Sequence, residues 1–293
     1  MKRILITGAF GQLGVEMISV LGKQCDLLAT DTVIPEDFSA EPFSVVMDIT
    51  SPRQVKEVID AYQPDVVVNL AAMTDVDACE LHPDQSQRVN RDGVQYLLEN
   101  FSGYFIQIST DYVFDGTAGP YSETDPPQPI NQYGRSKLSA ERLLQSSPNR
   151  TLILRTNVLY GYTKRTRASF VKWVVDSLKE GQSIPVVDDQ WNNPTWTRAL
   201  AETVHSLLAK DVEGMYHYGG AELLNRYQFA QRIASVFHLD SQLIRPVKTE
   251  ALKQPAPRPL RSGLKTEKIE VEWHQSPLPV EEGLKQIRKA LEA

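Results

Sequence analysis

The sequence predicts an α/β protein: a doubly wound parallel sheet with helices on both faces, joined to a smaller, discontinuous α/β part. Two observations indicate this fold. Short apolar runs alternate with segments of helical periodicity through the first half of the chain, which is the order of a parallel sheet. The first apolar run also breaks into three glycines spaced three apart, directly before a helical segment.

The opening turn contains Gly8, Gly11 and Gly14. A turn without side chains lets backbone approach a pyrophosphate, and the following helix N-terminus offers unpaired N–H groups. A tight turn with nothing bound is the alternative interpretation. Asp31, at the end of the second apolar run, favours a nucleotide site, because this fold uses an acid there to bond the adenine-ribose hydroxyls. Since the same acid repels a 2′-phosphate, NAD(H) is favoured and NADP(H) stays open as the alternative.

The rest of the first half continues the alternation. Strands are expected at 44–47, 64–72, 104–108 and 152–154, and helices at about 51–59, 83–101 and from about 131. Asp48 follows the strand at 44–47 and is either a simple turn residue or a partner of the adenine amino group. The strand at 104–108 delivers Thr110 to its carboxyl end, the edge at which open α/β sheets bind ligands.

The second half has a looser pattern. It contains a basic loop (Lys164, Arg165, Arg167), expected helices at 170–178, 199–208, 227–237 and 280–291, a short strand at 215–217, and a Pro- and Arg-rich segment at 253–262. We therefore expect a nucleotide-binding domain from residues 1–156 plus about 190–215. The substrate-binding part would comprise about 157–190 and 216–275, and 276–293 would form a closing helix.

Composition excludes several classes of protein. A net charge of −6 argues against a nucleic-acid or anionic-membrane surface as the main partner. The two cysteines, Cys25 and Cys79, lack the spacing of a zinc site or a disulfide scaffold. No apolar stretch approaches the length of a membrane span, so we expect a cytoplasmic protein without a membrane partner.

Tyr133 and Lys137 lie one helical turn apart and follow the Ser109-Thr110 strand end. A tyrosine protonates an alkoxide near neutral pH if its pKa is lowered, and a lysine one turn away supplies the positive charge. A hydroxyl on the neighbouring strand would orient the carbonyl being reduced. An exposed pair arising by chance is the alternative, but the order of glycine turn, acid, strand-end hydroxyl and Tyr-x-x-x-Lys favours catalysis.

These features form motifs in a fixed order: Thr7-Gly8-x-x-Gly11-x-x-Gly14, Asp48, Asn69-Leu70-Ala71-Ala72, Ser109-Thr110-Asp111-Tyr112-Val113-Phe114-Asp115-Gly116 and Tyr133-x-x-x-Lys137. In this order the chain resembles the extended short-chain dehydrogenase/reductases, and within them the dTDP-4-dehydrorhamnose reductase group. The resemblance runs over nearly the whole chain. It implies a Rossmann-like fold and reduction of a 4-keto-6-deoxy nucleotide-diphosphate sugar by NAD(P)H, in deoxysugar or polysaccharide biosynthesis. A homodimer is also implied.

The resemblance also implies roles for individual residues. Tyr133 would be the proton donor, Lys137 its partner and a ribose ligand, and Thr110 the hydrogen-bonding partner of the carbonyl. The cofactor would contact, besides the three glycines, Asp31, Asp48, Tyr133 and Lys137, the residues Phe10, Gln12, Leu13, Thr32, Ile49, Leu70, Ala71, Ala72 and Thr74. The substrate would contact Thr110, Asp111, Tyr112, Asn157, Val158 and Arg258, with Arg258 on the diphosphate; the alternative for Arg258 is a solvated surface arginine.

Departures from the family pattern leave alternatives open. Val158 stands where the rhamnose enzymes carry a tryptophan against the sugar, so the pocket is changed. Glu16 matches a position that bridges subunits through Mg²⁺ in some relatives, but Arg198 stands where another glutamate would be, so we expect no metal. Tyr112 after Asp111 disfavours a 4,6-dehydratase, whereas an epimerase stays open. The chain also resembles the regulatory beta subunit of methionine adenosyltransferase, which acts through a protein partner.

Overall fold

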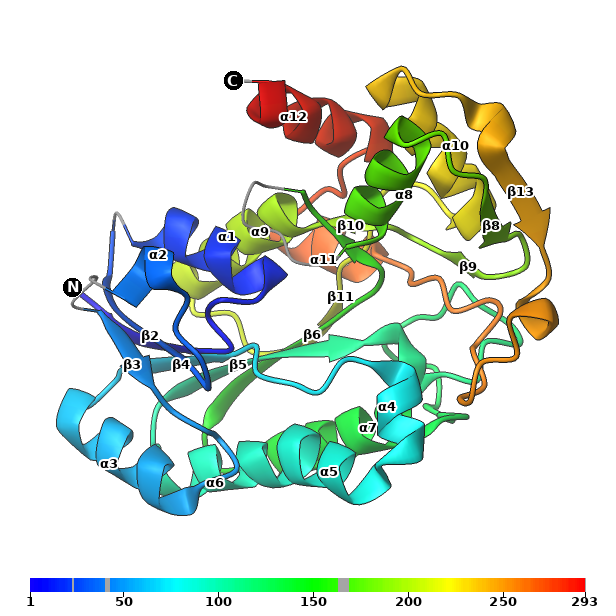
Figure 1. The fold of residues 1–293 in the computed structure, drawn as a ribbon. Coiled ribbons are helices and arrows are strands. Elements are labelled where there is room, and N and C mark those ends of the chain that lie inside the picture. The colour runs from blue at the N-terminus through cyan, green and yellow to red at the C-terminus, as the bar shows by residue number, and fades with distance from the viewer. Residues whose placement is uncertain (23, 40–42, 163–168, 293) are drawn as a thin grey trace.

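The computed structural model describes residues 1–22, 24–39, 43–162 and 169–292 (Figure 1). The predicted basic loop with Lys164, Arg165 and Arg167 lies outside these residues. Seven parallel strands form the central sheet: β1 (Arg3–Thr7), β2 (Asp26–Asp31), β3 (Ser44–Val46), β4 (Val66–Asn69), β5 (Tyr104–Thr110), β6 (Arg150–Thr156) and β11 (Gly214–His217). Their order is β11-β6-β5-β4-β1-β2-β3. The chain order reverses at β1, which lies between β2 and β4, and a ligand crevice is expected at such a point.

Side chains alternate between the two faces of the sheet. Ile4 and Ile6 of β1 face one apolar cluster and Leu5 faces the other, as the period of two in a strand requires. The first cluster packs under α1 (Gln12–Leu21), α9 (Thr197–Ala209) and α11 (Glu267–Trp273), and the second over α3 (Pro52–Tyr62), α6 (Gly93–Asn100) and α7 (Gln132–Ser146). Figure 1 shows α1 and α9 above the sheet and α3, α6 and α7 below it. The predicted doubly wound fold is confirmed.

The helix predicted at 83–101 is more complex than its periodicity suggests. It begins as α5 (Pro83–Gln87), widens to a single π-helical turn, η1 (Arg88–Asp92), and continues as α6. A further short helix that the sequence did not reveal, α4 (Val76–Leu81), precedes it and is capped by the Asp75 carboxylate. The π-helical turn η1 and the short helix α4 both lie beside α7, so they shape the surroundings of the helix that carries Tyr133 and Lys137.

A second apolar core lies outside the sheet. It is built by α8 (Phe170–Lys179), α10 (Arg226–Phe237) and α12 (Val280–Glu292), together with the parallel pair β8 (Ile184–Val187) and β13 (Ile244–Val247). Shorter elements complete the chain: α2 (Glu36–Ser39), η2 (Asp111–Val113), β7 (Leu159–Tyr160), β9 (Trp191–Asn192), β10 (Thr195–Trp196), β12 (Leu224–Asn225), η3 (Ser241–Leu243) and η4 (Thr249–Leu252).

The chain crosses between the sheet and the second part several times. β11 is an edge strand of the main sheet, and α11 packs in the cluster beneath α1 and α9. We propose to assign both to the nucleotide-binding part, which modifies the boundary near residue 215 expected from sequence. Within the described residues, no helix combines the length and the apolar composition needed to cross a membrane.

Candidate active site

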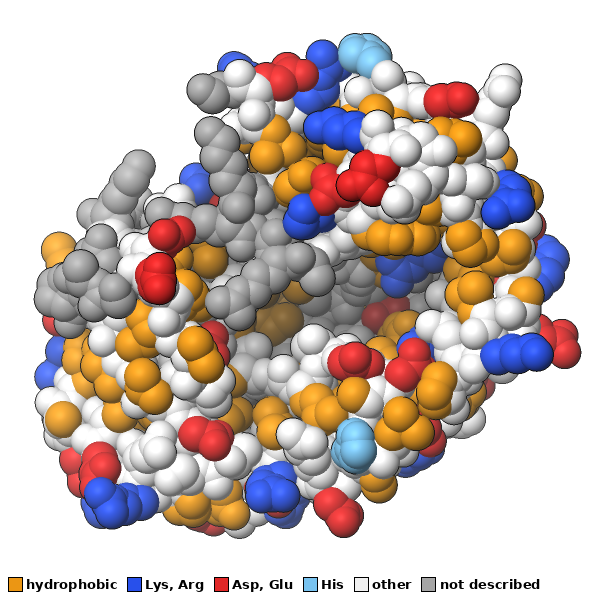
Figure 2. Space-filling model, in the orientation of Figure 1, with side chains coloured by type: hydrophobic (Ala, Val, Ile, Leu, Met, Phe, Trp, Pro, Cys, Tyr) orange, Lys and Arg blue, Asp and Glu red, His pale blue; other side chains and the backbone are white. Residues whose placement is uncertain are grey.

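A cavity of about 640 Å³ opens at the carboxyl ends of the central strands and is closed on one side by the second part. Figure 2 shows the surface hollowed in the middle of this face. Most residues predicted to bind cofactor or substrate line it: Gly8, Gly11, Gln12, Leu13, Gly14, Asp31, Thr32, Asp48, Ile49, Leu70, Ala71, Ala72, Thr74, Thr110, Asp111, Tyr112, Tyr133, Lys137, Asn157 and Val158. The structure thus brings together residues that are up to 150 positions apart in sequence. Phe10 and Arg258 are not among the residues that line the cavity.

The glycine turn is pressed against the end of β4. Gly8 has a φ of +63°, and a Cβ there would lie 2.6 Å from the backbone nitrogen of Ala71. A Cβ on Gly14 would collide with the carbonyl of Ala9. Gly8 and Gly14 therefore have room only for backbone, and α1 begins between them at Gln12, so this part of the cavity fits a pyrophosphate at a helix N-terminus.

Asp31 is held rigidly at the end of β2. Its carboxylate accepts hydrogen bonds from the backbone N–H of Phe10 at 3.2 Å and of Thr32 at 2.8 Å. Phe10 contributes this N–H, but its ring packs 4.9 Å from the ring of Phe38. Asp48 accepts a bond from the Thr50 N–H, as a turn residue does, and also lines the cavity, so both roles proposed for it remain compatible with the structure.

Tyr133 and Lys137 both project from α7 into the cavity wall. The Lys137 ammonium donates to the carbonyl of Ile108 at 2.7 Å, and burial lowers its pKa to about 8. Burial raises the pKa of the Tyr133 phenol, and the hydroxyl of Thr110 opposes this only in part. Lys137 is not among the groups that chiefly shift this pKa, so the lowering expected from the sequence is not found: the phenol is held protonated, which is the state a proton donor needs.

Thr110 and Asp111 form a buried polar pair at the end of β5. The Thr110 hydroxyl accepts from the Tyr112 N–H and donates to the Asp111 carboxylate, both at 3.1 Å. The other Asp111 oxygen accepts from the Ser262 hydroxyl at 2.5 Å. Burial raises the pKa of Asp111 to about 6. The Thr110 oxygen is thereby fixed at the cavity wall, where it can meet a carbonyl oxygen after its hydroxyl turns.

Arg226 is a cavity residue that sequence reasoning missed. It opens α10 directly after the Asn225 cap, and its guanidinium lies 5.3 Å over the ring of Phe170. Among the described residues the guanidinium has no hydrogen bond or ion pair, although an arginine always carries its charge. The asparagine cap marks a helix start in the sequence, but nothing local shows that this helix begins at the cavity.

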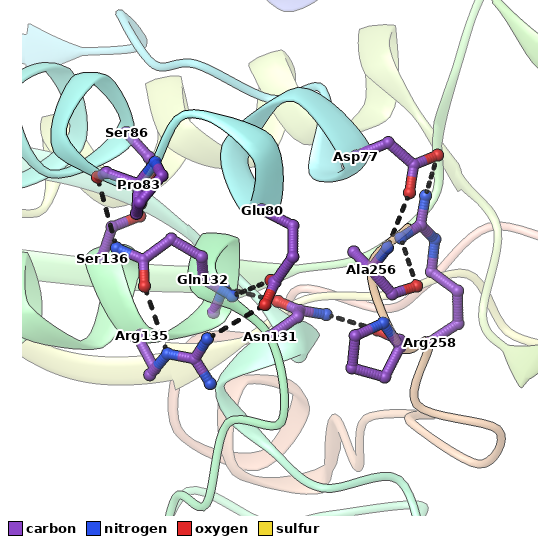
Figure 3. A network of polar contacts seen from close by, with 12 residues as sticks. Asp77, Glu80, Pro83, Ser86, Asn131, Gln132, Arg135, Ser136, Ala256 and Arg258 are labelled. Carbon is purple, nitrogen blue, oxygen red and sulfur yellow. Dashed lines mark hydrogen bonds and ion pairs between the residues drawn. The ribbon is translucent and has the colours of Figure 1, made fainter. Parts of the chain in front are cut away.

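Arg258 is directed elsewhere. Its guanidinium forms an ion pair with Asp77 of α4 at 2.8 Å and donates to the carbonyl of Ala256 at 3.0 Å, while the Ala256 N–H returns a bond to Asp77 (Figure 3). These contacts hold the guanidinium against α4, and Arg258 does not line the cavity, although its charge acts on the lining residues Tyr112 and Arg226. The structure does not bring Arg258 into the position expected for a ligand of the substrate diphosphate.

The start of α7 is held by the same network of polar contacts. Asn131 caps the helix by accepting from the Gly134 N–H and donates to the carbonyl of Pro257, and Glu80 of α4 accepts from the Gln132 N–H and from Arg135 (Figure 3). The residue after Gln132 is Tyr133. The network therefore fixes the first turn of the helix that carries the phenol.

Val158 has a φ of +43°, a conformation that a β-branched residue adopts at a cost of order 1–3 kcal/mol. It lies on the cavity wall beside Asn157, at the position where the resemblance places a tryptophan. Backbone strain of this kind concentrates at functional sites. We therefore propose that this turn forms part of the wall that meets the substrate.

Glu16, which matches a subunit-bridging position of some relatives, lies in an ion-pair arrangement. Arg198 lies 3.6 Å from the Glu16 carboxylate and 2.7 Å from that of Glu202. In the part of the chain that the structure describes, no group of three His, Cys, Asp or Glu side chains is placed to hold a metal ion. Arg198 supplies to Glu16 the positive charge that a metal would otherwise provide.

Comparison with known proteins gives consistent matches over the full chain. A family model described as RmlD substrate binding domain matches residues 1–293. A probable low-salt glycan biosynthesis reductase of Haloferax volcanii is 34% identical, with 97% of each chain covered. The crystal structure of dTDP-4-dehydrorhamnose reductase from Bacillus anthracis in complex with NADP has a TM-score of 0.88 at 30% identity, covering 98% of this chain and 99% of that one. The methionine adenosyltransferase 2 subunit beta of Danio rerio is 31% identical over 92% of this chain and 84% of its own length.

Proposed function

This chain belongs to the family described as the RmlD substrate binding domain, and on that basis we propose that it reduces the 4-keto group of a 4-keto-6-deoxy nucleotide sugar. It is an NAD(P)-dependent oxidoreductase. The observation that carries the proposal is the convergence of Thr110, Tyr133 and Lys137 with the glycine turn on one cavity. When bound, the dinucleotide supplies the hydride.

Three residues of the cavity have separate roles in this reaction. Thr110 turns its hydroxyl from Asp111 to the keto oxygen and holds it beside the Tyr133 phenol. Tyr133 donates its proton to the oxygen as negative charge develops there, which is general acid catalysis. Lys137, anchored on the Ile108 carbonyl, places a positive charge next to the phenolate that remains and is positioned to hold a ribose hydroxyl.

Arg226 is our candidate for the ligand of the substrate diphosphate, in place of Arg258. Its guanidinium lines the cavity from the second part and forms no hydrogen bond or ion pair with the described residues, although the Asp111 carboxylate attracts it across the cavity wall. Arginine presents two parallel N–H donors to phosphate oxygens, so the side chain is suited to this role. We propose that the diphosphate lies between Arg226 and the Asn157–Val158 turn.

Arg226→Met is expected to raise KM for the nucleotide sugar about 10- to 100-fold, because a hydrogen bond to a charged group is worth about 1.5–3 kcal/mol. Initial-rate kinetics measure this effect, with KM for the cofactor as an internal reference. Arg245→Met on β13 is the matched control, since that arginine is exposed outside the cavity and its loss should leave KM unchanged. An unchanged KM in the Arg226 variant would contradict the assignment.

The nucleotide specificity that we propose, NAD(H) over NADP(H), depends on Asp31. Its carboxylate is held against the Phe10 and Thr32 amides and lines the cavity where the adenine ribose would lie. Asp31→Ala is expected to raise the ratio of kcat/KM for NADPH to that for NADH on the order of tenfold, since it removes a like charge near the 2′-phosphate. Asp31→Asn is a matched variant with the same shape. A ratio that stays constant in both variants would refute the role of Asp31.

The reaction itself is tested by mixing the purified protein with NADH, NADPH and a panel of dTDP-, UDP- and GDP-4-keto-6-deoxy sugars while following nicotinamide absorbance. Oxidation with one sugar identifies the substrate class. Tight NAD(P)H binding without turnover across the panel would favour the second candidate, a regulatory subunit acting through a protein partner. Val158 at the sugar-stacking position favours that candidate. A cytoplasmic location and a homodimer stay predictions.

A further inference from the structure

Glu141 continues the row of catalytic side chains on α7. Tyr133, Lys137 and Glu141 are each four residues apart, so they occupy one face of the helix on successive turns. Glu141 is completely buried. A buried carboxylate needs hydrogen-bond donors or an opposite charge close to it. Glu141 takes no part in the hydride and proton transfers proposed above.

The partners of Glu141 surround its carboxylate on two sides. One oxygen accepts from the Ser109 hydroxyl at 2.5 Å and from the Arg155 Nε at 2.9 Å, and the other accepts from the Arg155 Nη2 at 2.6 Å. Ser109 lines the cavity. Because Lys137 is bonded to the carbonyl of Ile108, the lysine and the glutamate are anchored on consecutive residues of β5.

This placement sets two buried, oppositely charged side chains on successive turns of one helix face. Burial disfavours the charged form of Lys137 and lowers its pKa, and the negative charge of Glu141 is the influence that opposes it. The other titratable groups that face this row are Tyr133 on α7, Cys79 on α4, Asp111 in η2, Arg155 on β6 and His217 on β11. Burial lowers the pKa of His217 to about 3, so that ring is neutral and adds no charge.

We propose that Glu141 is a positioning residue: it keeps Lys137 in its ammonium form at working pH and fixes the Ser109 hydroxyl at the cavity wall. The inference rests on the proposed function in one respect, namely that Lys137 binds the dinucleotide. Arg155 holds the carboxylate in place through two parallel hydrogen bonds, so Glu141 acts on Lys137 as the acidic member of a buried ion pair one turn further along the same helix face.

The test measures NADH affinity against pH by nicotinamide fluorescence, in a Tyr133→Phe background that removes the phenol as a titrating group. With Glu141 present, affinity is expected to fall at alkaline pH as Lys137 loses its proton. With Glu141→Gln, the midpoint of that fall should move down by about one pH unit or more. Lys137→Met should abolish this fall in affinity at alkaline pH, both with Glu141 present and with Glu141→Gln.

A glutamine at position 141 leaves an Arg155 donor unmatched and can impair folding. The double variant Glu141→Gln/Arg155→Gln removes both charges of the pair and should shift the midpoint down less than Glu141→Gln alone, because loss of the Arg155 charge offsets part of the loss of the carboxylate. Glu141→Asp, which keeps the charge, should leave the midpoint close to that of the parent. Thermal melting establishes that each variant is folded. A folded Gln variant with an unmoved midpoint overturns the inference; a parent protein that binds neither NADH nor NADPH at any pH instead overturns the proposed function.

Discussion

Replacing Tyr133 by Phe is expected to lower kcat for keto-sugar reduction by about 10²-fold or more, because general acid catalysis typically contributes 10²–10⁴-fold. The phenyl ring remains able to pack edge-on against Tyr112, whose ring centre lies 5.8 Å away, so the cavity keeps its shape. NADH affinity near neutral pH should change little. The measurement is sugar-dependent oxidation of NADH together with a separate binding titration.

Tyr62→Phe is the matched control for this variant. Its hydroxyl donates to the carbonyl of Asp26, on the far side of the sheet from the cavity, and its removal should leave kcat within about twofold. Turnover of the Tyr133 variant within a few-fold of the parent would show that the proton comes from another group. Asp111 would then be the first candidate, since its pKa is raised to about 6.

Gly134→Ala is expected to reduce kcat by a comparable factor without touching any reacting group. A Cβ at this position would collide with the backbone carbonyl of Tyr112 and lie 2.9 Å from the Pro129 side chain. Helix α7 and the η2 turn must move apart to admit it, which separates Tyr133 from Thr110. A displacement of about 1 Å between catalytic groups costs about 10²-fold.

The control for the glycine variant is Gly181→Asn, at a surface turn with a φ of +69° and no neighbouring atom within 4 Å of an added Cβ. Asparagine tolerates that conformation, so activity and melting temperature should stay close to the parent values. If Gly134→Ala retains the parent kcat with an unchanged melting temperature, the close packing of α7 on η2 does not set the position of the phenol.

Local patterns in the sequence were sufficient to predict the fold and the residues that form one side of the cavity. The glycine turn, Asp31 and the Tyr133–Lys137 pair are recognisable because strand, turn and helix signals lie within a few residues of them. Arg226 was not recognisable, because its position depends on α10 meeting the sheet through the second apolar core. The same reason explains Arg258: its partner Asp77 is far away in sequence, and only the folded chain shows that the guanidinium is already paired.

The pairing of β8 with β13 and the π-helical turn η1 were also missed. The two strands are short, and four strands, two α-helices and one 3-10 helix lie between them in the sequence, so neither has a neighbour in sequence that indicates its partner. In η1 the polar sequence Arg88–Asp92 has ordinary helical composition, and the extra residue in the turn is set by contacts with α7. Glu141 was overlooked for a related reason, since a glutamate on a helix is usually exposed to solvent.

The placement of β11 limits where the chain of such an enzyme can be cut into fragments or joined to another domain. A fragment that ends at residue 156 would lack the edge strand beside β6 and two of the three helices, α9 and α11, that cover one face of the sheet. Its exposed strand edge and uncovered apolar face would favour aggregation. New substrate specificity therefore has to arise by replacing internal segments, such as the stretch that carries Arg226, and not by joining a different domain to either end of the sheet.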